Sequence, residues 1–244
     1  MQIQPMIKLS RCAKDPARLL AVCIALTACG AQAQSACSSD GQPQPVALLE
    51  RFVNADCETC WSDARTPKAG RGELAVDWIL PGGRGEDAPL SAAARRDGLA
   101  RLEQLGQQAP AQADLSQRKA QPIQSKLRVA HGPTFNDYVA ASIELKPGGG
   151  GPLKAWLVLV ETIPAGTEGT PVERNLVRNT YQPPWDGAGP LSKEERKRLF
   201  DSRPMHIPEG AKAERLRVVG WVEDARGHIR AIAQSRCVAA PGKE

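Results

Sequence analysis

The chain has 244 residues and a formal net charge of +5 at pH 7. Most of that surplus lies in the first 33 residues, so the rest of the chain carries about +2. No long basic run is interleaved with aromatic side chains, which excludes the usual pattern of nucleic-acid binding. Only 4% of residues are aromatic, whereas Gly (22) and Pro (20) are plentiful, and this predicts a loop-rich globular protein.

The first 33 residues have the pattern of a secretory signal. Basic residues precede the short apolar run "LLAVCIALTA", which has about half the length that a membrane-spanning helix needs. "LTAC", ending at Cys29, resembles a lipobox and would make Cys29 a lipid attachment site, whereas "AQA" at 31–33 fits an ordinary signal-peptidase site. We expect a bacterial cell-envelope protein of the periplasm or outer membrane, in contact with a membrane only through a lipid on Cys29.

The next stretch leads into two cysteines. Residues 46–53, "VALLERFV", predict a buried strand that runs directly to the C-x-x-C of Cys57 and Cys60. The helix that follows must be short, because Pro67 ends it. A cysteine pair between a strand and a helix start suits redox chemistry, since unpaired helix amides favour a thiolate.

Further elements follow up to residue 124. "ELAVDWIL" at 73–80 predicts a second strand, and Ser91 is a suitable N-cap for a helix that ends at Gly106. Residues 107–124 are rich in Gln and Ala and predict a linker or an eroded element.

The second half of the chain predicts short strands and one helix, and the number of strands suggests a small sandwich. The helix at 192–200 has capping-box spacing between Ser192 and Glu195. The expected strands are 127–132, 138–145, 153–163, 172–182, 216–224 and 228–237, with a glycine loop at 148–151.

These patterns predict an α+β protein in three parts. We place a signal at 1–33, a first domain at 34–122 and a mostly-β, sandwich-like domain at 123–244.

Four cysteines remain outside the signal, and they allow three pairings. Cys57 and Cys60 are the natural local pair, which leaves Cys37 to form a structural disulfide with Cys237. A four-cysteine zinc site is the alternative, disfavoured by the ligand spacing and by an oxidising compartment. The three histidines have no metal-ligand spacing, so we expect no metal and no cofactor.

Several segments together resemble the bacterial secreted, thioredoxin-like family called domain of unknown function 1223. "LERFVNADCETC", "AVDW" at 75–78 and "ARRDGLARL" match its first half in order, and "KAWLVLVE", "VERNLVRN" and "LRVVGWVEDARGHIRAIAQ" match its β half. The resemblance implies a thioredoxin-like first domain, here eroded, with an attached β domain. Two departures are Trp61, where the family has proline, and the segment 107–124, which replaces the stretch holding its second conserved proline.

The resemblance and the cysteine pair together predict thiol:disulfide exchange, an enzyme activity on a protein thiol or disulfide. Cys57 would attack and Cys60 would resolve the mixed disulfide. Asp77, at the family's V-D position, is a candidate to accept a proton from Cys60, with a surface or capping aspartate as the alternative. The competing function is a non-catalytic envelope binding or structural module in which both disulfides only stabilise the fold. For either function we expect a monomer.

Overall fold

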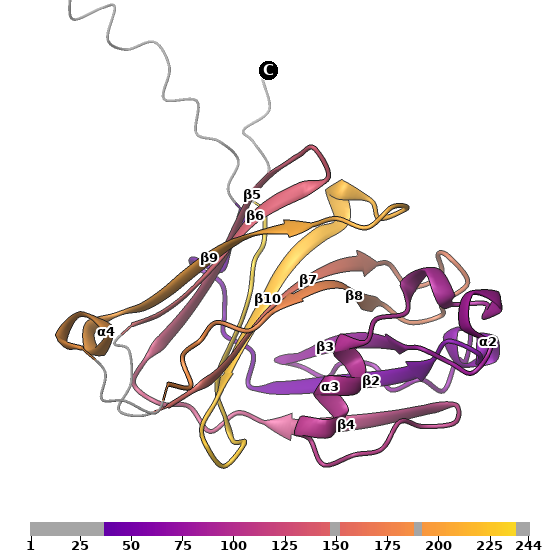
Figure 1. Cartoon of the computed structure of the whole chain (residues 1–244), viewed down its shortest axis with the longest axis horizontal. Coiled ribbons are helices and arrows are strands. Elements are labelled where there is room, and N and C mark those ends of the chain that lie inside the picture. Colours follow the sequence, from indigo (N-terminus) through magenta and orange to yellow (C-terminus); the bar gives the residue numbers. More distant parts are fainter. Residues whose placement is uncertain (1–36, 147–151, 188–191, 238–244) are drawn as a thin grey trace, which may run out of the picture. The chain divides into compact units, whose positions relative to one another are not determined.

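The structure is a computed structural model that describes residues 37–146, 152–187 and 192–237. The expected signal with Cys29 and the expected glycine loop at 148–151 lie outside these ranges. Within them, the strands form one four-stranded and one seven-stranded sheet (Figure 1).

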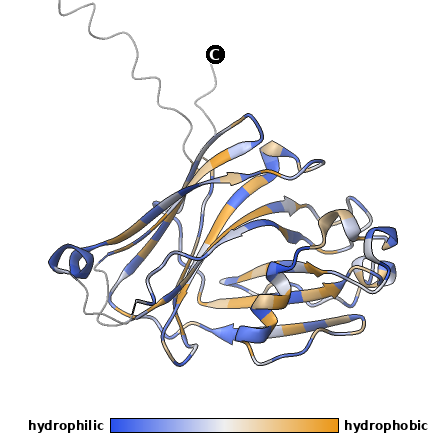
Figure 2. Ribbon diagram, viewed as in Figure 1, coloured by the Kyte–Doolittle hydropathy of each residue, from blue (hydrophilic) through white to orange (hydrophobic). Residues whose placement is uncertain are grey.

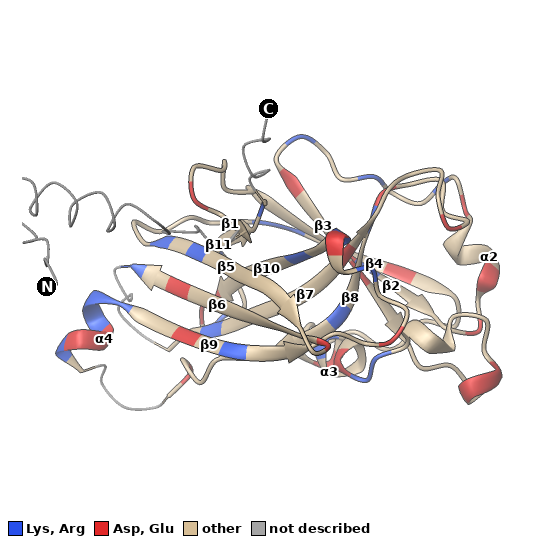
Figure 3. Ribbon diagram, turned by 90° about the horizontal axis from the view of Figure 1, so that it is seen from above, with Lys and Arg blue, Asp and Glu red and all other residues tan. Residues whose placement is uncertain are grey.

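The four-stranded sheet is antiparallel and has the order β1-β5-β6-β9. Burial alternates along β6, as expected for a strand with one face on the core and one in solvent. Charged residues of both signs accordingly lie along β6 and β9 (Figure 3). The bounds are β1 Cys37–Ser38, β5 Lys126–Phe135, β6 Tyr138–Lys146 and β9 Leu199–His206.

The seven-stranded sheet has the order β11-β10-β7-β8-β3-β2-β4. The pairs β2–β3 and β3–β8 are parallel, and the other neighbours are antiparallel. The bounds are β2 Ala47–Asn54, β3 Glu73–Leu80, β4 Ala113–Lys119, β7 Lys154–Ile163, β8 Arg174–Tyr181, β10 Leu216–Glu223 and β11 Ile229–Gln234.

The helices of the described ranges are short. They are α2 Glu58–Trp61, α3 Asp97–Gln104 and α4 Lys193–Lys197, with 3₁₀ turns at Gly85–Asp87, Ser91–Ala93 and Ala213–Arg215. The predicted capping box of α4 is confirmed by reciprocal contacts between Ser192 and Glu195. The charged sequence of α4 is hydrophilic throughout (Figure 2).

The core lies on both faces of the seven-stranded sheet. Val129 and Ile143 of the four-stranded sheet pack with Leu157 and Val218 in one cluster. The two sheets approach each other closely at Gly220, where an added Cβ would be 2.7 Å from Val129 Cγ1. The opposite face holds a second cluster of fifteen buried side chains, which includes Leu102 of α3 and the indoles of Trp78, Trp156 and Trp221.

Most predicted strands are confirmed, and three expectations are wrong. The segment 107–124 contains a strand, β4, whose mainly exposed side chains give no hydrophobic pattern but whose backbone pairs with β2. The predicted helix begins at Asp97 rather than after Ser91, since Ala94 is extended and the Ser91 hydroxyl donates to the Glu86 carbonyl. The end of the expected helix at 192–200 belongs to β9, which the sequence analysis did not predict.

The expected domain boundary near residue 122 falls between β4 and β5, which lie in different sheets. Strands of the two expected domains nevertheless join in one sheet, because β3 pairs with β8. The described residues together form one compact unit. The described residues are thus mostly β and form two sheets.

Candidate functional site

The C-x-x-C follows the carboxyl end of β2, where the chain turns into α2. The Cys57 amide donates to the Asn54 carbonyl at 3.0 Å, and Cys57 is the N-cap of α2. Cys57 and Cys60 form a disulfide, and both residues are partly exposed. The second predicted disulfide, Cys37–Cys237, is also formed. The four cysteines are therefore engaged in two bridges rather than in one zinc site.

Asp56 precedes Cys57, and its carboxylate is directed at backbone amides. Its oxygens accept from the Gly83 amide at 2.8 Å and from the Arg84 amide at 3.2 Å. These contacts tie the loop after β3 to the turn that carries the cysteines. Much of the negative charge beside Cys57 is thereby satisfied by the backbone.

Asp77 is fully buried in β3 and lies between two arginines. Arg51 donates to its Oδ2 at 2.7 Å and Arg174 to its Oδ1 at 3.0 Å. The Asn175 amide also donates to Oδ2, at 2.9 Å. Asp77 is thus neither a surface nor a capping aspartate, and its hydrogen-bond partners are the two guanidinium groups and one amide.

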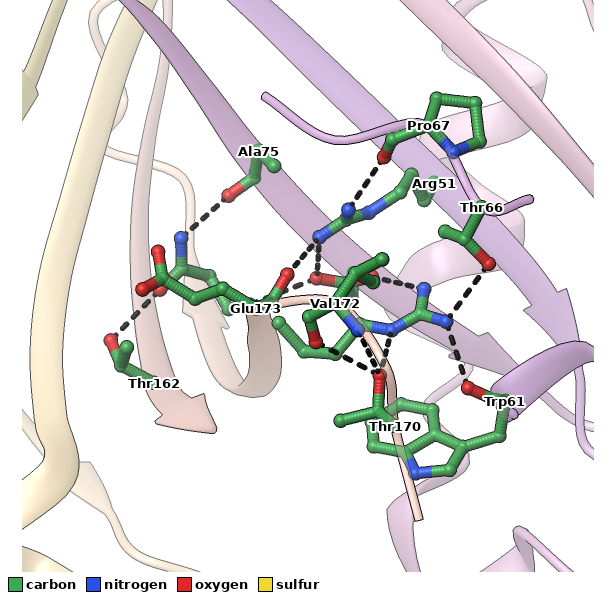
Figure 4. Close-up of polar contacts among 12 residues, drawn as sticks. Arg51, Trp61, Thr66, Pro67, Ala75, Thr162, Thr170, Val172 and Glu173 are labelled. Atoms are coloured by element: carbon green, nitrogen blue, oxygen red, sulfur yellow. Dashed lines mark hydrogen bonds and ion pairs between the residues drawn. The ribbon is translucent and has the colours of Figure 1, made fainter. Parts of the chain in front are cut away.

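Arg174 connects Asp77 to the cysteine segment. Its Nη2 atom donates to the Trp61 carbonyl at 3.0 Å and lies 3.4 Å from the Cys60 carbonyl. The same atom contacts Thr66, and the guanidinium lies 4.9 Å from the centre of the Trp61 ring (Figure 4). Burial lowers the pKa of Arg174, and the charge of Asp77 acts in the opposite direction. Acceptance of a Cys60 proton by Asp77 stays a prediction.

A cleft of about 300 Å³ opens beside Cys60. One wall is the start of β4 with Gln112 and Leu115, and the other includes Arg65 and Pro67. Arg51 and Arg174 line it together with Asp63 and Asp114, so charges of both signs lie beside apolar side chains.

A second buried ionic cluster lies on the opposite face of the sheet, because Glu50 and Arg51 are neighbours in β2. Arg101 of α3 donates to Glu50 at 2.8 Å and to Glu223 at 2.6 Å, and its guanidinium lies 5.2 and 5.3 Å from the ring centres of Trp156 and Trp221. Burial opposes the charge of Arg101, but the two carboxylates outweigh it and raise its pKa. This cluster anchors α3 to β2 and β10.

The Cys37–Cys237 bridge has an unpredicted neighbour, His131 of β5. A ring nitrogen of His131 and the two sulfur atoms all lie within 4.8 Å of one another. Burial lowers the pKa of His131. The sequence carried no signal for this proximity, because no ligand spacing links residues 37, 131 and 237.

The sequence analysis also missed Arg51 and Arg174 as partners of Asp77. A signal was present for Arg51, a charged residue inside an apolar strand.

Comparison with models of known families, with curated proteins and with solved structures gave no match. Among the described residues, no helix is both long and apolar enough to cross a membrane.

Proposed function

We propose that this chain is a thioredoxin-like protein of the bacterial cell envelope that exchanges thiols and disulfides through Cys57 and Cys60. The observation that carries the proposal is a closed, partly exposed disulfide at the end of a central strand, beside a cleft. In the reduced protein, the Cys57 thiolate attacks a substrate disulfide and one substrate sulfur leaves as a thiol. Cys60 then attacks Cys57, releases the second substrate thiol and restores the bridge.

The strand arrangement supports a thioredoxin-like ancestry. The strand before the cysteines, β2, has the following strand β3 as a parallel neighbour and the later strand β4 as an antiparallel one. Pro110 lies just before β4, and its carbonyl accepts from the Asn54 side chain at 3.3 Å. A proline therefore lies close to the end of the strand that precedes the cysteines, within the segment that replaces the family's proline stretch.

The charges near the pair support a reactive thiol. Arg51 and Arg174 share the carboxylate of Asp77, and Arg174 donates to the Cys60 and Trp61 carbonyls, so a guanidinium group lies next to the cysteine segment. Positive charge near a cysteine lowers the pKa of its thiol and increases the fraction of nucleophilic thiolate.

One observation favours the non-catalytic alternative. Cys60 and Trp61 pack against a buried cluster that includes Val53, Ile79 and Leu176. A bridge held in this way by the core and by Arg174 would serve only to stabilise the turn.

A trapping experiment separates the two functions. The reduced chain is mixed with a disulfide-bonded polypeptide, and mixed disulfides are counted by mass spectrometry. We expect C60S to accumulate a mixed disulfide at Cys57, the wild type to turn over without accumulating one, and C57S/C60S to do neither. C37S/C237S is the matched control and should behave as the wild type. Equal reduction of the polypeptide by C57S/C60S and the wild type would refute the exchange function.

Membrane attachment is proposed to occur through a lipid on Cys29. We expect radiolabelled palmitate to be incorporated by the wild type and to be absent from C29A. Equal labelling of the two chains would exclude Cys29 as the lipid-bearing residue.

A further inference from the structure

We infer that Cys37, His131 and Cys237 form a thiolate–imidazole site for a thiophilic metal ion such as Zn²⁺, which is available once the Cys37–Cys237 disulfide is reduced. This inference concerns a different place in the fold from the C-x-x-C and does not depend on the function proposed above. The starting observation is that both sulfur atoms and a His131 ring nitrogen lie within 4.8 Å of one another.

His131 is prepared as a ligand by its own hydrogen bond. Its Nδ1 lies 3.0 Å from the Gly132 carbonyl oxygen, and because a carbonyl only accepts, the neutral ring carries its proton on Nδ1. The lone pair is then on Nε2, which is buried and has no hydrogen-bond partner within the described residues. His131 is only 7% exposed, so this is an unsatisfied polar atom in the interior. A metal ion would satisfy it, and the carbonyl would orient the ring, as outer contacts of metal-bound histidines usually do.

The backbone holds the three ligands together independently of the sulfur–sulfur bond. Cys37 is paired directly with His131 across β1 and β5. On the other side, Ser38 and Arg236 exchange two backbone hydrogen bonds, of 2.9 and 3.1 Å, which keep Cys237 next to β1. Opening the bridge therefore leaves both thiols at the site.

The spacing suits one metal ion. With Zn–S bonds of about 2.3 Å, two thiolates on a tetrahedral ion are about 3.8 Å apart, so the sulfurs need to separate by less than about 2 Å from their bonded positions. Cys37 is buried, whereas Cys237 is exposed and lines a cleft of about 300 Å³. The cleft provides the entry path and the open side for a fourth ligand such as water.

The chemistry balances with a dithiol reductant. The dithiol gives two electrons and two protons to the Cys37–Cys237 bridge and becomes a disulfide, and the protein then holds two thiols. Zn²⁺ binding displaces both thiol protons and forms two Zn–S bonds and one Zn–N bond. The oxidised chain has no thiolate to offer and does not bind the ion at this site.

The test uses the full chain with the other five cysteines, at 12, 23, 29, 57 and 60, replaced by serine. After anaerobic reduction and removal of the reductant, the chain is titrated with Co²⁺, and then with Zn²⁺ in competition with a chromophoric chelator. We expect one Co²⁺ per chain with sulfur-to-cobalt charge-transfer absorption, which one equivalent of Zn²⁺ displaces. The oxidised chain should bind neither ion.

Two variants examine the imidazole. Loss of an outer contact already weakens metal sites 10- to 100-fold, so H131A should weaken Zn²⁺ binding by at least about tenfold. H228A is the matched control, because the His228 ring pairs with Asp224, and it should bind as tightly as the parent. H131N, which keeps a polar side chain in the same strand, guards against a folding defect in H131A and should also bind weakly. Absence of metal from the reduced parent, or equal affinity of H131A, H131N and the parent, would overturn the inference.

Discussion

Single buried charges determine the geometry around the candidate site. Asp77 satisfies Arg51 and Arg174 at once, and Arg174 in turn holds the Trp61 carbonyl next to Cys60. Ions removed from water are tolerated only with such partners, and removing one partner leaves an uncompensated charge. The chain thus couples the position of the cysteine turn to a carboxylate in the adjacent strand.

Replacing the buried carboxylate tests this coupling. D77N leaves two guanidinium groups without a counter-charge, and loss of one partner of a buried pair costs about 3–5 kcal/mol. We expect a decrease of that size in the free energy of unfolding, measured by urea titration. E194Q is the control, since Glu194 forms an exposed pair with Lys197, and its unfolding midpoint should match that of the wild type. Equal midpoints for D77N and the wild type would contradict the described cluster.

The second ionic cluster predicts a dependence of stability on pH. Burial acts to raise the pKa of Glu223, but its contacts with Arg101 and Arg118 outweigh burial and hold the pKa below the ordinary value. The folded state therefore favours the ionised carboxylate. The contribution of Glu223 to the free energy of unfolding is fully present at neutral pH. It is lost as the pH falls below about 4.3, the value in the unfolded chain, and on through the lower pKa of the folded state.

The measurement compares urea unfolding of the wild type and E223Q between pH 7 and pH 3. E223Q should be the less stable protein at pH 7, and the difference should shrink as the solution is acidified. A difference that stays constant over this range would show that Glu223 has the same pKa in the folded and unfolded chains.

At the scale of elements, the contact between the two sheets depends on a residue without a side chain. An added Cβ on Gly220 of β10 would lie 2.7 Å from Val129 Cγ1 and 3.2 Å from Ile143 Cδ1. Both neighbours are buried in the layer between the sheets and have little room to move.

We expect G220A to destabilise the protein by about 1–3 kcal/mol, the usual cost of overpacking a core. G132A is the matched control, because Gly132 is also in a strand and a Cβ there meets no atom within 4 Å. Its unfolding midpoint in urea should stay close to that of the wild type. Equal unfolding midpoints for G220A and G132A would contradict the close approach of the two sheets at Gly220.

The sequence predicts elements here only where burial leaves a pattern. The predicted bounds of β3 are the observed ones, because every position after the first is buried and is either apolar or part of a buried ion pair. β4 escapes prediction because its mainly exposed side chains have no periodicity and its stability comes from backbone pairing with β2. The start of α3 depends on the Arg95 amide donating to Ile79, a tertiary contact that local sequence cannot reveal.

The candidate site was predictable to a similar extent. The cysteine pairings follow from spacing and compartment, and both are confirmed. The partners of Asp77 lie 26 and 97 residues away along the chain, and no local pattern connects them. The same holds for His131, which approaches the second bridge only through pairing of β1 with β5.

At the scale of the whole molecule, the Cys37–Cys237 bridge closes a loop of 200 residues. In the chain-entropy account, a loop of this length removes about 5 kcal/mol of unfolded-state entropy, whereas the Cys57–Cys60 loop removes about 2 kcal/mol. We therefore expect C37S/C237S to lower the free energy of unfolding more than C57S/C60S does, as measured by urea titration. The reverse order would mean that the short bridge holds the fold.

We expect the two bridges to have different roles, and one redox titration tests this difference directly. The purified chain is equilibrated in graded glutathione buffers and alkylated, and free thiols are counted at each cysteine by mass spectrometry. We predict that the Cys57–Cys60 bridge opens reversibly with a midpoint potential above about −270 mV, while the Cys37–Cys237 bridge stays closed. If both bridges resist reduction below about −300 mV, both are structural and the exchange function is wrong.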